Sequence, residues 1–157
     1  PLGMAAGCRY TAQLEEACRL VMAQLEDSFS WKLVYQSRSG PPTQPWLEPD
    51  VCDYLRDVHE RGEHTDVVVV PIGFISDHME ILFDLDTEAH ELCSEIGLGM
   101  VRASTVGTDP RFVSMIRELV LERTSGASRE YLGEQGASHD ICPQDCCPSG
   151  RPAGRPR

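Results

Sequence analysis

The feature that most constrains the fold is a nearly unbroken apolar run in residues 66–74, DVVVVPIGF. A run this apolar is typical of a parallel strand that is covered on both faces. Around it, apolar residues recur at three- and four-residue steps, which predicts amphipathic helices. Helices that alternate with buried strands predict an α/β fold, a parallel sheet flanked by helices on both faces. The predicted helices cover residues 11–25, 50–61, 76–96 and 109–123, and a second short strand covers residues 100–103.

Capping and turn residues set the expected boundaries of these elements. Ser76 or Asp77 is suited to cap the helix that follows the strand, and Gly97 is suited to end it. Residues 32–36 form a short β-prone run. The Gly- and Pro-rich residues 39–49 can be neither a helix interior nor a central strand, so they predict a shaped loop.

The composition is that of a folded domain followed by a C-terminal segment with few apolar residues. With 157 residues, 41% of them hydrophobic, the chain is long enough for one ordinary domain. We expect this domain to cover residues 1–124. Residues 125–157 are rich in Gly, Ser, Pro and Arg and lack apolar periodicity, which predicts a flexible, disordered tail.

The charge balance argues against nucleic acid as a partner. Lys and Arg number 14 against 25 Asp and Glu, a formal net charge of -11, so the surface field repels phosphate backbones. The longest apolar runs are far shorter than a membrane span, and no basic-then-apolar leader opens the chain. We expect a soluble, cytoplasmic protein with no transmembrane segment.

The seven cysteines fall into two groups. An odd number at irregular spacing is a poor disulfide framework, which favours free thiols or a metal site. Four cysteines lie in regions of apolar patterning and are expected to be small core residues: Cys8, Cys18, Cys52 and Cys93. The other three are clustered in the tail sequence ICPQDCCP and favour metal ligation, with an unstructured cysteine-bearing tail as the alternative: Cys142, Cys146 and Cys147. Zinc is a weaker option, for which Cys93 or His139 could complete the site.

Polar side chains follow the predicted strand, at the point where open α/β sheets bind ligands. In residues 71–88, PIGFISDHMEILFDLDTE, His78 and Glu80 stand two residues apart in the turn that leads into the next helix. An imidazole beside a carboxylate suits a divalent cation, and it equally suits a base oriented by an acid. A surface or capping role is the simpler alternative for His78, and the spacing alone does not choose among these roles.

An acidic stripe continues from this pair. Glu80, Asp84 and Glu88 follow at four-residue intervals, so on a helix they share one face. One interpretation is a solvated helix face in an acidic protein. The other is a path of carboxylates that attracts a cation or carries protons outward. Both stay open at this point.

Two long motifs carry a resemblance to a known family. Residues 71–88 resemble, almost residue for residue, the ferrochelatase motif built on Ser-Asp-His-x-Glu and a following acidic helix. Residues 35–49, YQSRSGPPTQPWLEP, resemble the loop of the same family that carries Gln-Ser-Arg, Gly-Pro and Pro-Trp-Leu. The resemblance covers roughly residues 10–124 and implies a chelatase-like half domain of a lyase that inserts Fe²⁺ into a porphyrin in heme biosynthesis. Residues 84–88 and the tail cysteines are most similar to the actinobacterial branch, which implies coproporphyrin III rather than protoporphyrin IX.

The resemblance implies a role for each matching residue. Glu80 would bind iron or pass it to the macrocycle, His78 would be its hydrogen-bonded neighbour, and Asp84 would continue the acidic line. Trp46 and Tyr10 would be aromatic walls of the porphyrin pocket, although each could simply pack on its own segment. The implied porphyrin-binding residues are Tyr10, Ser37 and Trp46.

The family resemblance also bears on cofactors. The reaction needs no organic cofactor, because iron is itself a substrate. Several ferrochelatases hold a [2Fe-2S] cluster on a C-terminal cysteine cluster and take a fourth ligand from the N-terminal half. The resemblance therefore implies a possible cluster on Cys142, Cys146 and Cys147.

Two departures from the family pattern shape the expectation. Pro1 looks like the proline of the family's Ala-His-Ser-x-Pro motif, so we expect the essential histidine just before this chain. Only residues 6–9 separate Ala5 from Tyr10, where the family has a longer Gly-rich segment. We therefore expect a C-terminal half of a ferrochelatase and leave open whether it is active alone. The alternatives are a non-catalytic fragment that binds metal or tetrapyrrole, and an iron-sulfur module built on the tail.

Overall fold

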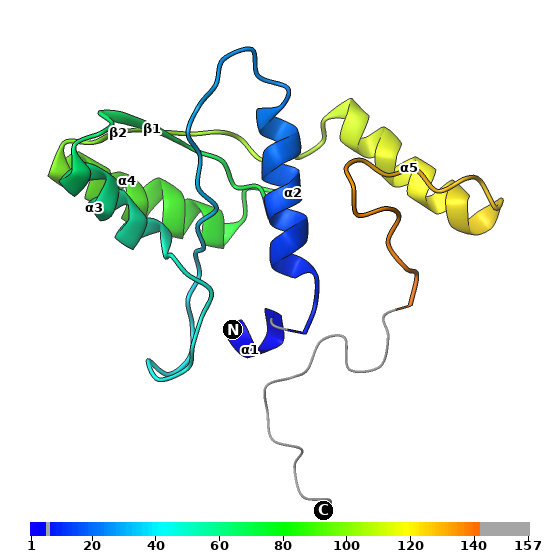
Figure 1. Cartoon of the computed structure of the whole chain (residues 1–157), viewed down its shortest axis with the longest axis horizontal. Coiled ribbons are helices and arrows are strands. Elements are labelled where there is room, and N and C mark those ends of the chain that lie inside the picture. The colour runs from blue at the N-terminus through cyan, green and yellow to red at the C-terminus, as the bar shows by residue number, and fades with distance from the viewer. Residues whose placement is uncertain (6, 142–157) are drawn as a thin grey trace, which may run out of the picture. The chain divides into compact units, whose positions relative to one another are not determined.

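The chain forms two compact units. The computed structural model describes residues 1–5 and 7–141. Unit 1 contains residues 1–50 together with residues 138–141 of the described chain, and unit 2 contains residues 51–137. Both units are drawn in Figure 1, with the elements labelled along the chain.

Unit 2 is built on two parallel strands. β1 (Asp66–Val69) pairs with β2 (Gly99–Arg102) in parallel, and a helical segment joins them, as parallel pairing requires. This confirms the predicted α/β fold and both predicted strands. β1 is shorter than the apolar run at residues 66–74 because the run contains Pro71, which has no N–H to donate to a strand ladder.

Helices cover one face of this sheet. α3 (Val51–Arg61) and α4 (His90–Ile96) lie on the same side of β1 and β2 (Figure 1). On the other face the paired residues Val68 and Val101 are 70% and 65% exposed. The prediction of a strand covered on both faces is therefore wrong for the described residues. An apolar run shows that the side chains can be buried, but it does not show which face of the sheet is covered by a helix.

The segment between β1 and β2 contains a helix of unusual width. Its first part is the π-helix η1 (Ile81–Ala89), and α4 continues directly from it. In a π-helix each N–H bonds to the carbonyl five residues back. The His90 N–H donates to the Leu85 carbonyl in this way, and Thr87 Oγ1 donates to the Leu82 carbonyl at 3.0 Å. The apolar pattern predicted a plain α-helix, because it shows which residues face the core and not how the backbone is bonded.

The core of unit 2 lies where α3 packs on η1 and α4. Cys93 is 1% exposed, which confirms its predicted core position, whereas the other three cysteines of that group are only half-buried. α4 ends as predicted at Gly97, whose φ of 74° is left-handed, a conformation that favours glycine. The buried apolar residues are Val51, Leu55, Val58, Ile81, Leu85, Ala89, Cys93 and Leu98.

The last helix of unit 2 is α5 (Pro110–Thr124). It begins where the helix at residues 109–123 was expected, and Asp109 caps it: its Oδ1 accepts the Arg111 N–H at 2.8 Å, and Pro110 occupies the first turn. Residues 125–141 form no helix or strand. The predicted division into a domain at 1–124 and a tail stays a prediction.

Unit 1 contains two helices and a long loop. α1 (Leu2–Ala5) is a single turn, and α2 (Tyr10–Met22) confirms the helix expected at residues 11–25, with slightly different ends. The β-prone run at residues 32–36 does not form a strand. Tyr35 makes only an isolated bridge, because a β-prone run becomes a strand only where an adjacent edge pairs with it.

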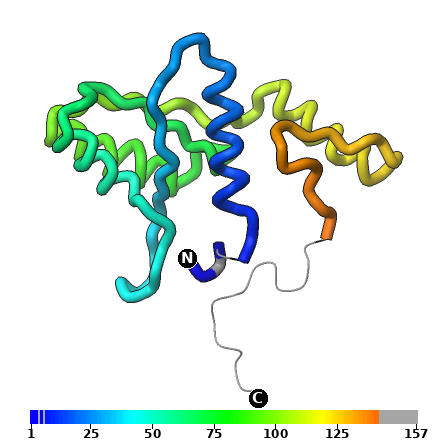
Figure 2. The backbone as a smooth tube through the Cα atoms, viewed as in Figure 1, coloured from blue at the N-terminus to red at the C-terminus, as the bar shows by residue number. Residues whose placement is uncertain are grey.

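The loop at residues 39–49 is shaped as predicted by backbone hydrogen bonds. The Tyr35 N–H donates to the Pro49 carbonyl at 2.9 Å, and the Gln44 N–H donates to the Pro41 carbonyl at 2.9 Å. The chain therefore leaves Tyr35, turns, and comes back beside it, as the cyan loop of Figure 2 shows. The loop needs no strand or helix of its own to hold this course.

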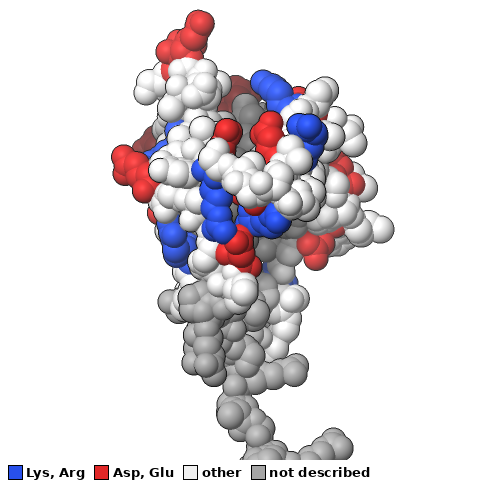
Figure 3. All heavy atoms as spheres, turned by 90° about the vertical axis from the view of Figure 1, so that its right-hand side faces the viewer, with Lys and Arg blue, Asp and Glu red and all other residues white. Residues whose placement is uncertain are grey.

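Charged side chains of both signs appear on the molecular surface. Figure 3 shows acidic and basic side chains side by side with uncharged ones on the face that it draws. None of the described helices is long and apolar enough to cross a membrane.

Candidate functional site

His78 lies at the start of the helix that follows β1. Its carbonyl accepts the Leu82 N–H at 3.1 Å, and its ring Nδ1 accepts the Glu80 N–H at 3.2 Å. These are the two bonds that an N-cap residue makes. The prediction of Ser76 or Asp77 as the cap is therefore wrong, because the imidazole itself takes the N–H that their side chains were expected to take.

The His78 ring is held in a defined orientation. Phe74 packs against it edge to face, with ring centroids 4.8 Å apart and an interplanar angle of 70°. Because Nδ1 accepts a hydrogen bond, the neutral ring carries its proton on Nε2. The Nε2–H is therefore the ring group that can donate a hydrogen bond to a ligand or a neighbouring carboxylate. The capping role and a chemical role for His78 are compatible, since they use different nitrogens.

The acidic residues form the stripe that their spacing predicted. On this helix the residues Ile81, Leu85 and Ala89 are all buried to 2% exposure or less, so residues four apart lie on one line. The carboxylates each precede one of these residues, and they therefore follow a second line beside the buried one. Its end members are exposed and its middle member is half-buried. The stripe consists of Glu80, Asp84 and Glu88.

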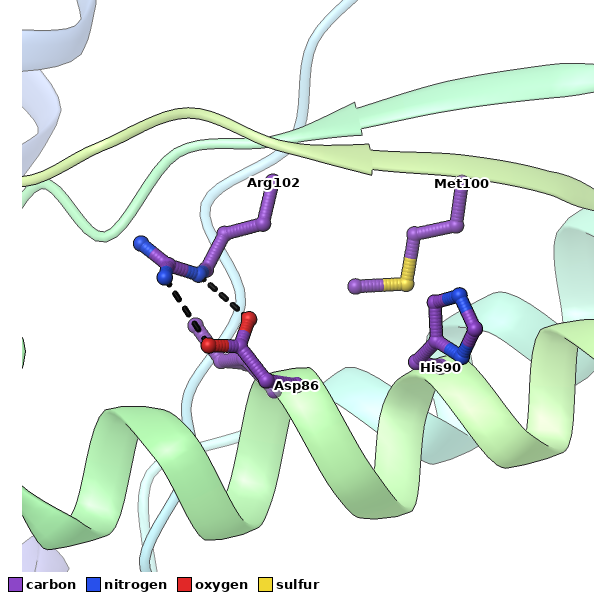
Figure 4. Close-up of a pocket in the computed structure, with 5 residues that line it drawn as sticks. Asp86, His90, Met100 and Arg102 are labelled. Atoms are coloured by element: carbon purple, nitrogen blue, oxygen red, sulfur yellow. Dashed lines mark hydrogen bonds and ion pairs between the residues drawn. The ribbon is translucent and has the colours of Figure 1, made fainter.

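A hollow of about 240 Å³ lies between the helix and β2 (Figure 4). Asp86 and His90 reach it from the helix, and Met100 and Arg102 reach it from the strand. Arg102 donates to Asp86 through Nε and Nη2, at 2.5 and 2.8 Å, and through Nη1 to Asp77 at 3.0 Å. This ion-pair cluster joins the loop before His78, the helix and the strand.

The cluster shifts the pKa values of its members. The hydrogen bonds from Arg102 hold the pKa of the Asp86 carboxyl below its usual range, against the opposing effect of burial. The same contacts raise the pKa of Arg102, so both groups stay charged at neutral pH. Sequence analysis missed Arg102. The available signal was an arginine at the end of the second strand, because ends of parallel strands meet at one edge of a sheet.

The predicted porphyrin-binding residues lie in unit 1. Tyr10 is the first residue of α2 and is 47% exposed, and Trp46 is half-buried in the loop at residues 39–49. Ser37 has a positive φ of 62°, uncommon for a residue with a side chain, and accepts a hydrogen bond from Gln36 Nε2 at 3.4 Å. The structure joins His78 to Glu80 within unit 2. A common cleft for the residues of both units stays a prediction.

Unit 1 also has a hollow of about 260 Å³ that sequence analysis did not anticipate. Burial raises the pKa of the Tyr35 phenol in its wall, and the negative charge of Glu15 acts in the same direction. The lining residues are Glu15, Trp31, Lys32, Leu33, Tyr35 and Glu48.

Within residues 1–5 and 7–141, no three His, Cys, Asp or Glu side chains are grouped so as to hold a metal ion. Cys142, Cys146 and Cys147, on which the cluster prediction rests, lie outside the described residues.

The parallel strand pair and its helices place the chain among α/β proteins, with an imidazole and a carboxylate following a strand where open sheets commonly bind ligands. The family model described as ferrochelatase matches residues 1–124. The chain belongs to the ferrochelatase family, as the two motifs predicted.

Relatives agree with this assignment. The chain is 55% identical over 148 residues to the ferrochelatase of Rhodopirellula baltica, with 94% of this chain and 42% of the relative covered. It is 48% identical over 155 residues to the coproporphyrin III ferrochelatase of Streptomyces griseus, with 93% and 41% covered. The corresponding protein of Nocardia farcinica is 46% identical over 154 residues, with 94% and 43% covered. The chain thus spans about 40% of the length of the curated relatives it matches.

Proposed function

We propose that this chain supplies the iron-handling part of a ferrochelatase. The observation that supports it most is the His78–Glu80 pair, which caps a helix at the end of a parallel strand in a chain of this family. In the proposed reaction Fe²⁺ replaces two pyrrole N–H protons of a porphyrin, so two N–H bonds break and two protons leave as the metal enters. Glu80 would receive the iron, the carboxylates beside it or water would accept the two released protons, and the His78 Nε2–H would donate a hydrogen bond within the site.

The acidic stripe fits the same proposal. Asp84 and Glu88 continue the line that begins at Glu80, and carboxylates attract and exchange a hydrated divalent cation. Tyr10, Ser37 and Trp46 would contact the porphyrin. Two relatives at 46–48% identity are named coproporphyrin III ferrochelatases, which supports coproporphyrin III as the substrate. Classification as a lyase and a cytoplasmic location stay predictions from the sequence.

The test is metal insertion by a longer chain. This sequence would replace the matching part of the Rhodopirellula relative, and the product would receive coproporphyrin III and anaerobic Fe²⁺. We expect the Soret band to shift to that of the metalated ring. Glu95→Ala removes an exposed carboxylate from α4 and is expected to leave the rate unchanged, so it serves as the matched control for Glu80→Ala. A folded protein that binds porphyrin without metalating it would favour the alternative, a non-catalytic tetrapyrrole-binding function.

We also propose that Cys142, Cys146 and Cys147 ligate an iron-sulfur cluster. The proposal is supported by their clustering in ICPQDCCP. The longer chain, purified without oxygen, is expected to absorb in the visible region, and its variant with all three cysteines changed to serine is expected to be colourless. Equal spectra for the two proteins would contradict the proposal.

A further inference from the structure

We propose that Arg102 is a positioning residue for the iron site, acting through the loop that carries His78. This inference rests on the proposed function of His78 and Glu80. Arg102 touches neither residue, and the proposal concerns how it fixes their placement.

The first support is where Arg102 stands in the fold. It is the last residue of β2 and lies opposite Val69, the last residue of β1. The chain that leaves Val69 forms the loop at residues 70–78 and then the helix that carries Glu80. Arg102 therefore projects from the neighbouring strand at the edge of the sheet where that loop begins, as Figure 4 shows for its contact with Asp86.

The second support is how its hydrogen bonds are distributed. The guanidinium binds Asp86 on η1 with two nitrogens and reaches Asp77 with the third. Asp77 directly precedes His78, and Asp86 lies on η1 beyond Glu80. One rigid group thus fixes both ends of the segment that contains the pair. Nη1 also donates to the Ala103 carbonyl at 3.2 Å, which ties the group to its own strand.

The third support is the chemistry of the side chain. A guanidinium presents several N–H donors in a fixed plane, so it can hold two carboxylates at once in set directions. A lysine ammonium carries the same charge but acts as a point and does not reproduce this geometry. The Arg102 side chain is 17% exposed. By comparison, the side chain of Arg111, which pairs with the helix-capping carboxylate of Asp109, is 94% exposed. Arg102 is therefore held within its cluster rather than extended into solvent.

The cluster also has consequences for charge near the iron site. Asp77 and Asp86 would repel each other without Arg102, and each would be free to turn toward an incoming cation. With Arg102 in place, both carboxylates are held in ion pairs, so neither competes with Glu80 for iron. Arg102 therefore has two effects. It fixes the geometry of the loop and the helix, and it keeps Asp77 and Asp86 from competing for the cation.

The test reads the His78 ring in the 157-residue chain without metal or porphyrin. The chain is labelled with ¹⁵N-histidine, and the ring is assigned with His78→Gln at about pH 8.5, above the usual histidine pKa of roughly 6.5. In the wild type the proton is expected on Nε2, because Nδ1 accepts the Glu80 N–H. In Arg102→Lys the two tautomers are expected to average. Arg56→Lys, which changes an exposed ion pair on α3, is the matched control and is expected to keep the wild-type spectrum.

Two aspartate variants make the test independent of how well Arg102→Lys folds. Asp77→Ala releases only the loop and is expected to average the tautomers, whereas Asp77→Asn keeps an acceptor oxygen and is expected to restore the wild-type pattern. In the longer chain, Arg102→Lys is expected to lower turnover at least tenfold with the KM for porphyrin unchanged, in the range seen for residues that orient metal ligands.

The outcomes separate this inference from the proposed function. An unchanged His78 tautomer in both Arg102→Lys and Asp77→Ala would overturn the positioning role, even if the enzyme is active. Averaged tautomers in a protein that never metalates porphyrin would support the positioning of His78 and contradict the assigned iron chemistry. A uniform loss of dispersion across the spectrum of Arg102→Lys, with the wild-type tautomer kept in Asp77→Ala, would show a purely structural arginine.

Discussion

The two units differ in what holds them together. Every fully buried apolar side chain among the described residues lies in unit 2, in the core formed by α3, η1 and α4. In unit 1 the buried residue is a carboxylate, Glu16, and large apolar side chains such as Val21 and Trp31 are more than 40% exposed. Unit 1 is shaped by backbone hydrogen bonds in its loop. The residues proposed to handle iron therefore belong to the unit with a packed core, whereas the residues predicted to bind porphyrin belong to the unit whose large apolar side chains are mostly exposed.

The difference shows which side chains are held in place by contacts within this chain. His78 is fixed by a cap, a ring contact and an ion-pair cluster, all within unit 2. Trp46 is carried by a loop whose hydrogen bonds join backbone to backbone. We expect core and charge substitutions to lower the free energy of unfolding of unit 2 more than that of unit 1.

The largest effect is expected from the core. Leu85→Ala, at a position that is 2% exposed, is expected to lower the free energy of unfolding by about 2–5 kcal/mol. Leu14→Ala on the half-buried side of α2 is the matched control, with a clearly smaller loss. Both tryptophans, Trp31 and Trp46, belong to unit 1, so urea unfolding followed by circular dichroism reports both units and fluorescence reports unit 1. Equal losses for the two variants would remove the contrast between the units.

A smaller effect is expected in acid and is confined to unit 2. The pKa of Asp86 is depressed by Arg102, so its stabilising contribution is complete above the unfolded carboxyl pKa of about 3.9. That contribution is lost as pH falls through the lower folded value. The stability difference between the wild type and Asp86→Asn, measured by urea unfolding, is therefore expected to shrink below about pH 4. A difference that stays constant from pH 6 to pH 3 would contradict the depressed pKa.

The opposite pH limit is expected to affect unit 1. Burial raises the pKa of Tyr35, so the neutral phenol is favoured in the folded state, and its contribution is complete below the unfolded pKa of about 10. It is lost as pH rises through the higher folded value. Tryptophan fluorescence should therefore show unit 1 weakening above about pH 10 in the wild type and less so in Tyr35→Phe. Identical alkaline curves would show that Tyr35 is not responsible.

The smallest effect is a difference in thiol reactivity. Burial raises the pKa of Cys93, which is 1% exposed, so little thiolate is present to react at neutral pH. Cys52, half-buried on α3, is the comparison within the same unit. Mass spectrometry after brief alkylation is expected to find Cys52 modified well before Cys93. Comparable rates would show that the core of unit 2 opens readily.

Much of the fold could be predicted, because the decisive signals are local. Asp109 and Pro110 mark the start of α5, Gly97 marks the end of α4, and four adjacent valines mark β1. The width of η1 could not be predicted, since an apolar residue every fourth position is compatible with an α-helix as well as a π-helix. The absence of a strand at residues 32–36 also depends on a pairing partner, which local sequence does not contain.

The site was predictable to the same extent. His78 and Glu80 are neighbours in the sequence, and their place after an apolar run, together with the family resemblance, predicted them as site residues. Arg102 is 25 residues from Asp77 and 16 from Asp86, so their contact depends on how β2 pairs with β1. The cap was misassigned for a related reason: Ser76 and Asp77 are the usual capping types, and nothing local shows that the His78 ring takes their place.

The most direct test of the central claim is the steady-state kinetics of Glu80→Ala in the longer chain. If Glu80 receives the iron, turnover should fall at least 100-fold, the size expected for loss of a group that acts on the reacting atoms, while the affinity for coproporphyrin III stays within about twofold. Trp46→Ala should show the reverse, weaker porphyrin binding with turnover at saturation largely kept. Equal losses of turnover and porphyrin affinity in Glu80→Ala would contradict the role assigned to it.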